Sequence, residues 1–257
     1  MTDFCQILDW DSNFFGRRIA RVETDRLTSH SLEKILRWSQ QQGIECLYFL
    51  CSPDDDDSVI LAESAAFHFV DVRIELNWKP QELFCPQATV IHEYREADLE
   101  ELQQIASQVY TNTRFSLDNH FAPGRVAELY KEWLTLSCRS ESHKVFVAAD
   151  ENGLAGFITC ESDSSPTSKV GRIGLLALSA ENQGKGYGQQ LVQSAQNYFY
   201  STGVTEVEVV TQGRNVAAQR LYQTCGFRTY KVGLWYHKWF DVQSSHFSVS
   251  VSRHTEA

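Results

Sequence analysis

The most constraining feature of this chain is an apolar strand that leads directly into a glycine-rich turn. Residues 173–188 read IGLLALSAENQGKGYG, with three glycines in the last five positions. Leu191, Val192 and Ala195 then recur at helical spacing, so the turn opens a helix. The free amides at a helix N-terminus attract anions, and this order of elements therefore predicts a phosphate site. A plain turn with flexible glycines is the alternative.

The glycine turn matches neither of the two best-known phosphate loops. A Walker loop requires glycine at the place of Ser179. A dinucleotide fingerprint requires a third glycine at the place of Gln189 or Leu191. What remains is a Q-x-x-G-x-G pattern over residues 183–188, whose final glycines lack the β-carbons that would keep a ligand away from the backbone.

A second strand and helix follow the glycine turn. Residues 206–211 are expected to form a strand, and residues 215–227 read NVAAQRLYQTCGF. The glycine turn together with this N-x-x-A-x-x-L-Y-x-x-x-G-F pattern resembles the GCN5-related N-acetyltransferase (GNAT) family. The resemblance implies that acetyl-coenzyme A is the co-substrate and that the glycine turn holds its pyrophosphate.

The resemblance also implies the fold. A GNAT domain is an α/β fold with a mixed, mostly antiparallel sheet that is flanked by helices and has a splayed central strand pair. We expect this domain over residues 89–240, preceded by a smaller N-terminal α/β domain over residues 1–88. Residues 79–88 contain two prolines and are expected to be the linker. The polar residues 241–257 are expected to be a flexible tail.

The pattern of elements along the chain agrees with an α/β protein. Helical patterns begin near Ser31 and Pro123, cover residues 59–65 and 98–110, and follow the glycine turn. Strand patterns cover residues 18–22, 44–51, 67–78, 89–94, 144–149, 154–161, 170–178, 206–211 and 227–239.

Further motifs resemble the branch of the family that acetylates the 4-amino group of dTDP-4-amino-4,6-dideoxygalactose. They are residues 8–16 (LDWDSNFFG), the pair Arg114-Phe115, residues 128–133 (ELYKEW) and residues 172–177 (RIGLLA). The likeness spans residues 8–239. It implies that the acceptor is the amine of a nucleotide-linked sugar, and that the product feeds polysaccharide assembly.

Two other functions stay open at this stage. An acidic protein attracts cationic acceptors, so the substrate is alternatively an aminoglycoside, a polyamine or a peptide. A non-catalytic acyl-coenzyme A-binding module would need only the glycine turn. The tyrosine of the second motif, Tyr222, argues against such a module.

By resemblance, the main chain of Leu176, Ala177 and Leu178 binds the pantetheine arm and presents one amide to the thioester oxygen. Tyr222 is the candidate acid that protonates the departing thiolate, and its alternative is a core position. Asn215 contacts the coenzyme or caps its helix. The remaining coenzyme-binding residues are those of the glycine turn, Gln183, Gly184, Lys185, Gly186, Tyr187 and Gly188.

The general base is left unassigned. Asp71, Glu75 and His120 are candidates, but each has an ordinary alternative as strand surface or loop polarity. An electron-poor sugar amine can also lose its proton to water, which would remove the need for a dedicated base.

Residues 111–125 (TNTRFSLDNHFAPGR) are the candidate acceptor loop. Arg114 and Arg125 suit a diphosphate, because guanidinium groups bind phosphate oxygens in pairs. Phe115 suits a thymine ring, and His120 lies between the arginines in sequence. An ordinary helix connection is the alternative.

Composition excludes several classes of protein. A formal net charge of −10 argues against a nucleic-acid partner, so anion capture must be local. No apolar run is long enough for a membrane span, and the first residues do not resemble an export signal. Seven cysteines without a C-x-x-C pair favour reduced thiols over a disulfide frame or a zinc site. We therefore expect a cytoplasmic enzyme without a metal, acting on a small molecule, with a homodimer left open.

Overall fold

A computed structural model describes residues 4–81, 91–162 and 169–240. The strands of these residues form one ten-stranded sheet in the order β1-β2-β3-β10-β4-β9-β8-β7-β6-β5. The predicted boundary at residue 88 and the predicted tail over residues 241–257 lie outside the described residues. The division into two domains therefore stays a prediction.

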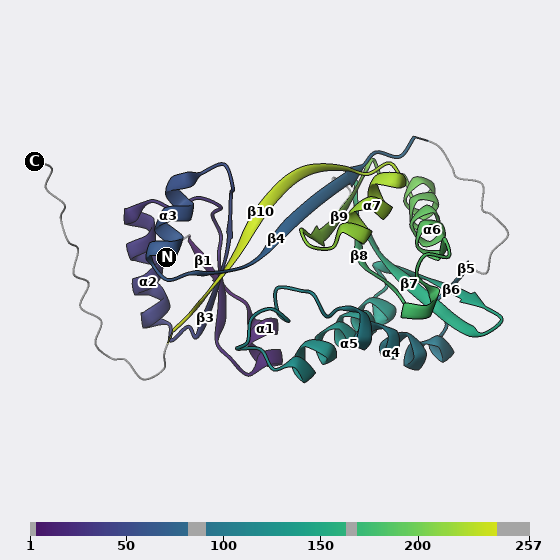
Figure 1. Cartoon of the computed structure of the whole chain (residues 1–257), viewed down its shortest axis with the longest axis horizontal. Helices are drawn as coiled ribbons and strands as arrows, with labels where there is room; N and C mark the ends of the chain where they lie inside the picture. Colours follow the sequence, from purple (N-terminus) through teal and green to yellow (C-terminus); the bar gives the residue numbers. More distant parts are fainter. Residues whose placement is uncertain (1–3, 82–90, 163–168, 241–257) are drawn as a thin grey trace, which may run out of the picture.

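The N-terminal half of the described chain lies at the left of Figure 1 and contains β1 to β3 and α1 to α3. β2 pairs in parallel with β3 and antiparallel with β1. Apolar side chains of the strands and of α2 and α3 form a separate core around Phe49 and Ile35. The elements are β1 (Cys5–Ile7), α1 (Asp9–Phe15), β2 (Ile19–Val22), α2 (Ser29–Gln41), β3 (Cys46–Cys51) and α3 (Asp56–Ser64).

Two long strands, β4 (His68–Trp78) and β10 (Arg228–Trp239), join the halves of the molecule (Figure 1). β10 pairs with β3 through its last six residues and with β4 along most of its length. β4 in turn pairs with β9 through residues 73–78. The N-terminal and C-terminal strands are thus hydrogen-bonded into a single sheet.

The C-terminal half contains the remaining strands, with α4 and α5 on one face of the sheet and α6 and α7 on the other (Figure 1). The strands are β5 (Ile91–Glu93), β6 (His143–Asp150), β7 (Gly153–Ser162), β8 (Val170–Leu178) and β9 (Glu206–Gln212). The helices are α4 (Leu99–Val109), α5 (Pro123–Arg139), α6 (Tyr187–Ser201) and α7 (Val216–Thr224), with short 3-10 turns η1 (Glu96–Asp98) and η2 (Ala180–Asn182).

The predicted α/β fold is confirmed, and the strands and helices predicted within the described residues occur at the expected places. β1 and α1 were not predicted, because three residues are too few to show an alternating pattern and the residues of α1 are mostly polar or aromatic. Among the described residues, no helix combines the length and apolarity needed to cross a membrane.

Candidate active site

Two neighbouring strands of the C-terminal half separate partway along their length. β8 pairs in parallel with β9 over four residues, ending at Ile173↔Val209. Beyond this pair β8 stays hydrogen-bonded to β7, whereas β9 stays hydrogen-bonded to β4. A bulge lies at the same level, where the Leu175 amide donates to Thr159 Oγ1 at 2.8 Å. The predicted splayed strand pair is therefore confirmed, and it opens one edge of β8.

The open edge of β8 carries backbone groups of Leu176 and Leu178. The Ser179 amide donates to the Ala155 carbonyl of β7 at 3.0 Å. Because bonded and non-bonded positions alternate in an antiparallel pair, Leu176 and Leu178 direct their amides and carbonyls away from β7. Ala177 directs its backbone groups toward β7 instead. Two of the three predicted residues thus direct their main-chain groups into the splay.

Two side chains contact this edge. Tyr110, at the end of α4, donates its hydroxyl to the Leu176 carbonyl at 2.9 Å. Gln183 Nε2 donates to the Leu178 carbonyl at 3.4 Å, which ties the glycine turn to the strand. Burial raises the pKa of Tyr110, and the neighbouring Tyr222 raises it further. Tyr110 thus fixes the Leu176 end of the open edge, and Gln183 fixes the Leu178 end.

The glycine turn is open to solvent. Gly186 is the N-cap of α6 with φ 89°, a conformation that favours glycine, and no described side chain caps the helix. A β-carbon on Gly184 would meet nothing within 4 Å, so the space above the turn is empty. Gly188 differs, because a β-carbon there would lie 3.1 Å from Leu221 of α7. Gly186 thus leaves the helix amides free, whereas Gly188 allows α6 and α7 to pack.

The side chains of the turn are held by neighbours. Lys185 Nζ donates to Asn182 Oδ1 at 2.9 Å, and the Tyr187 hydroxyl donates to Asp150 Oδ2 at 3.1 Å. The Asn152 amide is the main cause that lowers the pKa of Asp150. Lys185 is exposed, so its charge is available to an anion at the turn.

Tyr222 lies in α7 and is buried, with its ring 5.7 Å from that of Phe227. Burial raises its pKa well above the usual tyrosine value, so the phenol stays protonated at neutral pH. Asn215 precedes the same helix, and its side chain accepts from the Ala218 amide at 3.1 Å. Asn215 is therefore a helix cap in this structure, and its contact with the coenzyme stays a prediction.

Comparison with known proteins identifies the family. The sequence profile of the acetyltransferase (GNAT) family matches residues 99–227, half of the chain. The chain belongs to the GNAT family. It is an N-acetyltransferase that uses acetyl-coenzyme A.

Several relatives resemble this GNAT protein. It is 25% identical to the dTDP-fucosamine acetyltransferase of Escherichia coli over 237 residues, which cover 90% of this chain and 96% of the relative. It is 32% identical to N-alpha-acetyltransferase 30 of Schizosaccharomyces pombe over 87 residues, 34% of this chain and 58% of the relative. The crystal structure of a GCN5-related N-acetyltransferase from Sphaerobacter thermophilus is similar with a TM-score of 0.66 and 15% identity, covering 91% of this chain and 76% of that chain.

The residues of this GNAT site fit acetyl-coenzyme A. The open turn offers uncapped amides for a pyrophosphate, and the splay offers the outward-facing amides of Leu176 and Leu178 for the pantetheine arm. Within the described ranges, no group of three or more His, Cys, Asp or Glu side chains is arranged to hold a metal ion.

The loop before α5 places Arg114 in an aromatic box. Its guanidinium carbon lies 4.2 Å from the ring centre of Tyr48, 4.1 Å from that of Phe115 and 4.5 Å from that of Trp235. Arg114 Nη1 also lies 2.9 Å from His237 Nε2. Stacking of this kind fixes the plane of the guanidinium.

A buried chain of hydrogen bonds continues from Arg114. His237 is fully buried, and its Nδ1 lies 2.6 Å from Asp118 Oδ2, which also accepts from Trp239 Nε1 at 2.8 Å. Burial lowers the pKa of His237 to about 4, so the ring is neutral at pH 7. Burial alone would raise the pKa of Asp118, but hydrogen bonds from His237 and Trp239 lower it. The neutral ring therefore donates through Nδ1 and accepts from Arg114 through Nε2.

The other predicted residues of this loop are less central. His120 Nδ1 lies 2.8 Å from Asp118 Oδ1, so His120 joins the Arg114 network at its outer end. Arg125 bonds to Glu128 and to the Phe14 carbonyl, and it covers the Phe14 ring at 4.0 Å. Phe115 is buried in the aromatic core. The structure thus joins Arg114 and His120 but leaves Arg125 at the contact between α1 and α5.

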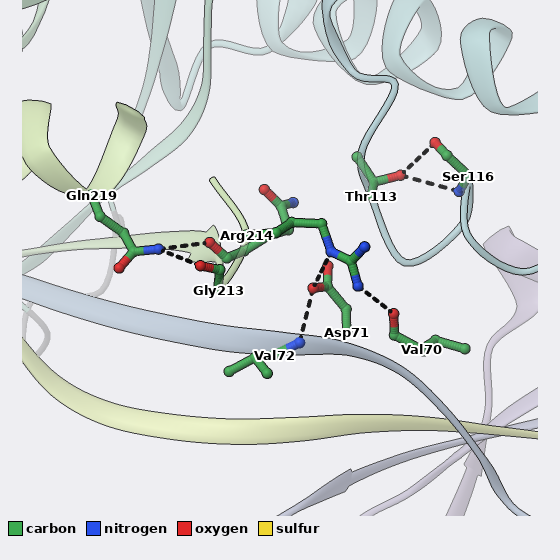
Figure 2. A network of polar contacts seen from close by, with 9 residues as sticks. Val70, Asp71, Val72, Thr113, Ser116, Gly213, Arg214 and Gln219 are labelled. Carbon is green, nitrogen blue, oxygen red and sulfur yellow. Dashed lines mark hydrogen bonds and ion pairs between the residues drawn. The ribbon is translucent and has the colours of Figure 1, made fainter. Parts of the chain in front are cut away.

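A second arginine, Arg214, lies close to the loop that carries Arg114. Figure 2 shows Arg214, in the loop between β9 and α7, pointing toward Asp71 of β4. Arg214 Nε lies 3.4 Å from Asp71 Oδ1, which also accepts from the Val72 amide at 2.8 Å. Gln219 Nε2 donates to the carbonyls of Gln212 and Gly213, which fixes the loop that carries Arg214.

Sequence reasoning missed several residues that the structure brings into the site. Tyr110 ends a helical pattern without a motif, Asp118 lies within the candidate acceptor loop but was not singled out there, and His237 falls in an ordinary strand pattern. Arg214 has a local signal, since it directly precedes the Asn215 that opens the second motif. Asp71 was weighed as a base, but nothing in the sequence separated it from Glu75.

Proposed function

We propose that this GNAT enzyme transfers acetyl from acetyl-coenzyme A to the amine of a nucleotide-linked amino sugar of the dTDP-4-amino-4,6-dideoxyhexose type. The observation that carries the proposal is the extent of the similarity to the dTDP-fucosamine acetyltransferase, 90% of this chain and 96% of the relative. That similarity includes the N-terminal half, which the GNAT profile does not reach. A shared transferase domain alone would not require it.

The coenzyme occupies the glycine turn and the splay. Its pyrophosphate lies against the amides of residues 184–188, with Lys185 nearby and Gln183 anchoring the turn to β8. The pantetheine arm pairs with the outward-facing amides of Leu176 and Leu178. Ala177 contributes by pairing with β7, which keeps its neighbours directed into the splay. Asn215 acts mainly as the cap of α7.

Acetyl transfer proceeds by direct attack of the neutral amine on the thioester carbon. A main-chain amide at the open edge of β8 donates to the oxygen that gains charge, an interaction worth about 3 kcal/mol in other acyl transferases. Tyr222 donates its proton to the departing thiolate. Its raised pKa keeps the proton on the phenol at neutral pH, and a thiolate that forms in the same dry surroundings is desolvated too, which favours its protonation.

Arg114 anchors the anionic part of the acceptor. Only its Nη1 donates to a described residue, His237, and its other N–H groups donate to none of the residues that the structure describes. A diphosphate matches such donors in charge and geometry. The enzyme would act in the cytoplasm, where acetyl-coenzyme A is made, and dimerisation is compatible with the proposal.

The test is thiol release from acetyl-coenzyme A with a panel of acceptors. We expect dTDP-4-amino-4,6-dideoxyhexoses to give a kcat/KM at least about 100-fold above those for aminoglycosides, polyamines and peptides, because each contact to the diphosphate and base adds binding energy. Equal or higher kcat/KM for a polyamine or an aminoglycoside would contradict the nucleotide-sugar assignment while leaving the acetyltransferase activity in place.

A further inference from the structure

Asp71 is a buried carboxylate with an incomplete set of partners. The residue is 2% exposed. Its Oδ1 accepts from the Val72 amide at 2.8 Å and, at a long 3.4 Å, from Arg214 Nε. Its Oδ2 accepts no hydrogen bond from the residues that the structure describes. Oδ2 is not among the fully buried polar atoms without a partner in the described residues, so it keeps some access to solvent and can accept from a donor that arrives with a ligand.

The position of Asp71 relates it to the splay. β4 pairs with β9 as far as Arg73↔Gln212. The last β8–β9 pair is Ile173↔Val209. If this register continued for three more residues, Leu176 would lie opposite Gln212. Asp71, two residues beyond Arg73 on β4, therefore lies at the far side of the splay from the open edge of β8.

The groups around Asp71 belong to the acceptor side of the site. Arg214 and Arg114 both lower its pKa, whereas burial, the largest cause, raises it. Burial raises the pKa of Tyr130 of α5 to about 12; the charge of Arg114 lowers this pKa and the charge of Asp71 raises it. Its ring stacks on that of Tyr110 at 4.2 Å, and Tyr110 binds the carbonyl at the open edge of β8. On its own sheet Asp71 has Arg73 two residues along β4, and the uncharged Trp235 opposite on β10.

Figure 2 shows the same arrangement from close by. The Asp71 and Arg214 side chains point toward one another above β4, and the loop with Thr113 and Ser116 lies on the far side of the guanidinium. This is the loop that carries Arg114. The carboxylate is thus placed between the splay and the loop that we assign to the acceptor.

We propose that Asp71 binds the ammonium group of the acceptor through Oδ2 and removes its proton before attack. The balance is complete without another reactant. One proton passes from the ammonium to Asp71, the neutral nitrogen forms the bond to the thioester carbon, and the carbon–sulfur bond breaks. The thiolate takes the Tyr222 proton, the nitrogen loses its remaining extra proton to the phenolate, and Asp71 returns its proton to solvent.

The inference requires an amine acceptor and rests on the proposed acetyl transfer, but it does not require that the amine belong to a nucleotide sugar. Arg214 has a secondary part in it. Its guanidinium keeps Asp71 ionised and holds one oxygen, which leaves the other for the ammonium. Two nearby arginines also repel an ammonium that is not in contact with the carboxylate, so Asp71 selects the position of the amine.

The test is the pH dependence of kcat/KM for Asp71→Asn, measured with the most reactive amine of the acceptor panel. Asparagine has the same shape and can still accept from the Val72 amide. We expect kcat to fall by about 10²-fold or more and the acidic limb of the profile to disappear. Burial raises the pKa of Asp71, so in the wild type this limb lies above the ordinary carboxylate value of about 3.9.

Two further variants separate this role from a structural one. Glu75→Gln removes a carboxylate of the same strand, one that forms an ion pair with Arg73. This variant should keep kcat within about twofold of the wild-type value and should keep the acidic limb of the pH profile. Arg214→Gln removes a charge that lowers the pKa of Asp71, so its limb should move to higher pH. Melting temperatures of all variants check that they fold.

A wild-type acidic limb in Asp71→Asn, with kcat within about threefold, would overturn the inference. So would a limb that disappears in Glu75→Gln instead. Preference for a polyamine in the panel would overturn only the acceptor assignment, because the same variants can then be measured with that polyamine. The two proposals therefore fail on different measurements.

Discussion

The two sides of the splay are built in different ways. The coenzyme side uses main chain and glycine, and nearly all of it comes from residues 173–188. The acceptor side uses charged side chains that come from distant segments, with Arg114 and His237 separated by 123 positions and Asp71 and Arg214 by 143. A ligand common to a whole family can be held by backbone, whereas recognition of a particular acceptor needs side chains that can vary.

The largest effect should come from closing the glycine turn. Gly186→Glu places a side chain at φ 89° and a negative charge where the pyrophosphate binds, so coenzyme affinity should fall by at least about 100-fold in calorimetry. Gly203→Glu is a matched control, since Gly203 also has a positive φ of 75° and ends the same helix in open space. Near-wild-type affinity in Gly186→Glu would place the coenzyme elsewhere.

The next effect separates chemistry from coenzyme binding. Tyr222→Phe removes the phenol proton while keeping the buried ring, so kcat should fall by about 10²-fold with coenzyme affinity unchanged. Tyr230→Phe, at an exposed tyrosine of β10, should leave both values intact. An unchanged kcat in Tyr222→Phe would show that another group protonates the thiolate.

A smaller effect should appear on the acceptor side. Arg114→Gln removes the proposed diphosphate contact, and the KM for a nucleotide sugar should rise about tenfold or more while the KM for a simple amine changes little. Arg125→Gln serves as the comparison, because Arg125 bonds to Glu128 and α1 instead. Equal changes for both acceptors would argue that Arg114 only stabilises the fold.

The smallest effect concerns stability against pH. Burial lowers the pKa of His237 from 6.5 to about 4, so between these values the unfolded chain binds a proton that the folded chain does not. Stability should therefore be full above about pH 6.5 and decline as the pH falls toward 4. Thermal melting of His237→Gln should show a weaker decline in this window. A wild-type melting temperature that stays constant from pH 7 to 4.5 would contradict a buried neutral ring.

The same contrast explains how far the sequence could predict this site. The glycine turn and the Tyr222 motif are local, because a strand, a turn and a helix bring their residues together without help from the rest of the fold. The Arg114–His237–Asp118 network depends on β10 running past the loop before α5, which no local pattern encodes. Arg125 was paired with Arg114 by sequence proximity alone, and the start of α5 directs it to α1.

The continuous sheet has a similar origin. The pattern of residues 67–78 and 227–239 predicts two strands but not their partners. β10 is long enough to pair with both β3 and β4, and this pairing joins segments that sequence reasoning assigned to separate domains.

The placement of both substrates in the splay is tested most directly by a crystal structure with coenzyme A and a dTDP-4-amino-4,6-dideoxyhexose bound together. We predict that the pyrophosphate contacts the amides of residues 184–188, and that the sugar amine lies between the open edge of β8 and Asp71. A pyrophosphate bound away from the glycine turn, or an amine outside the splay, would contradict it.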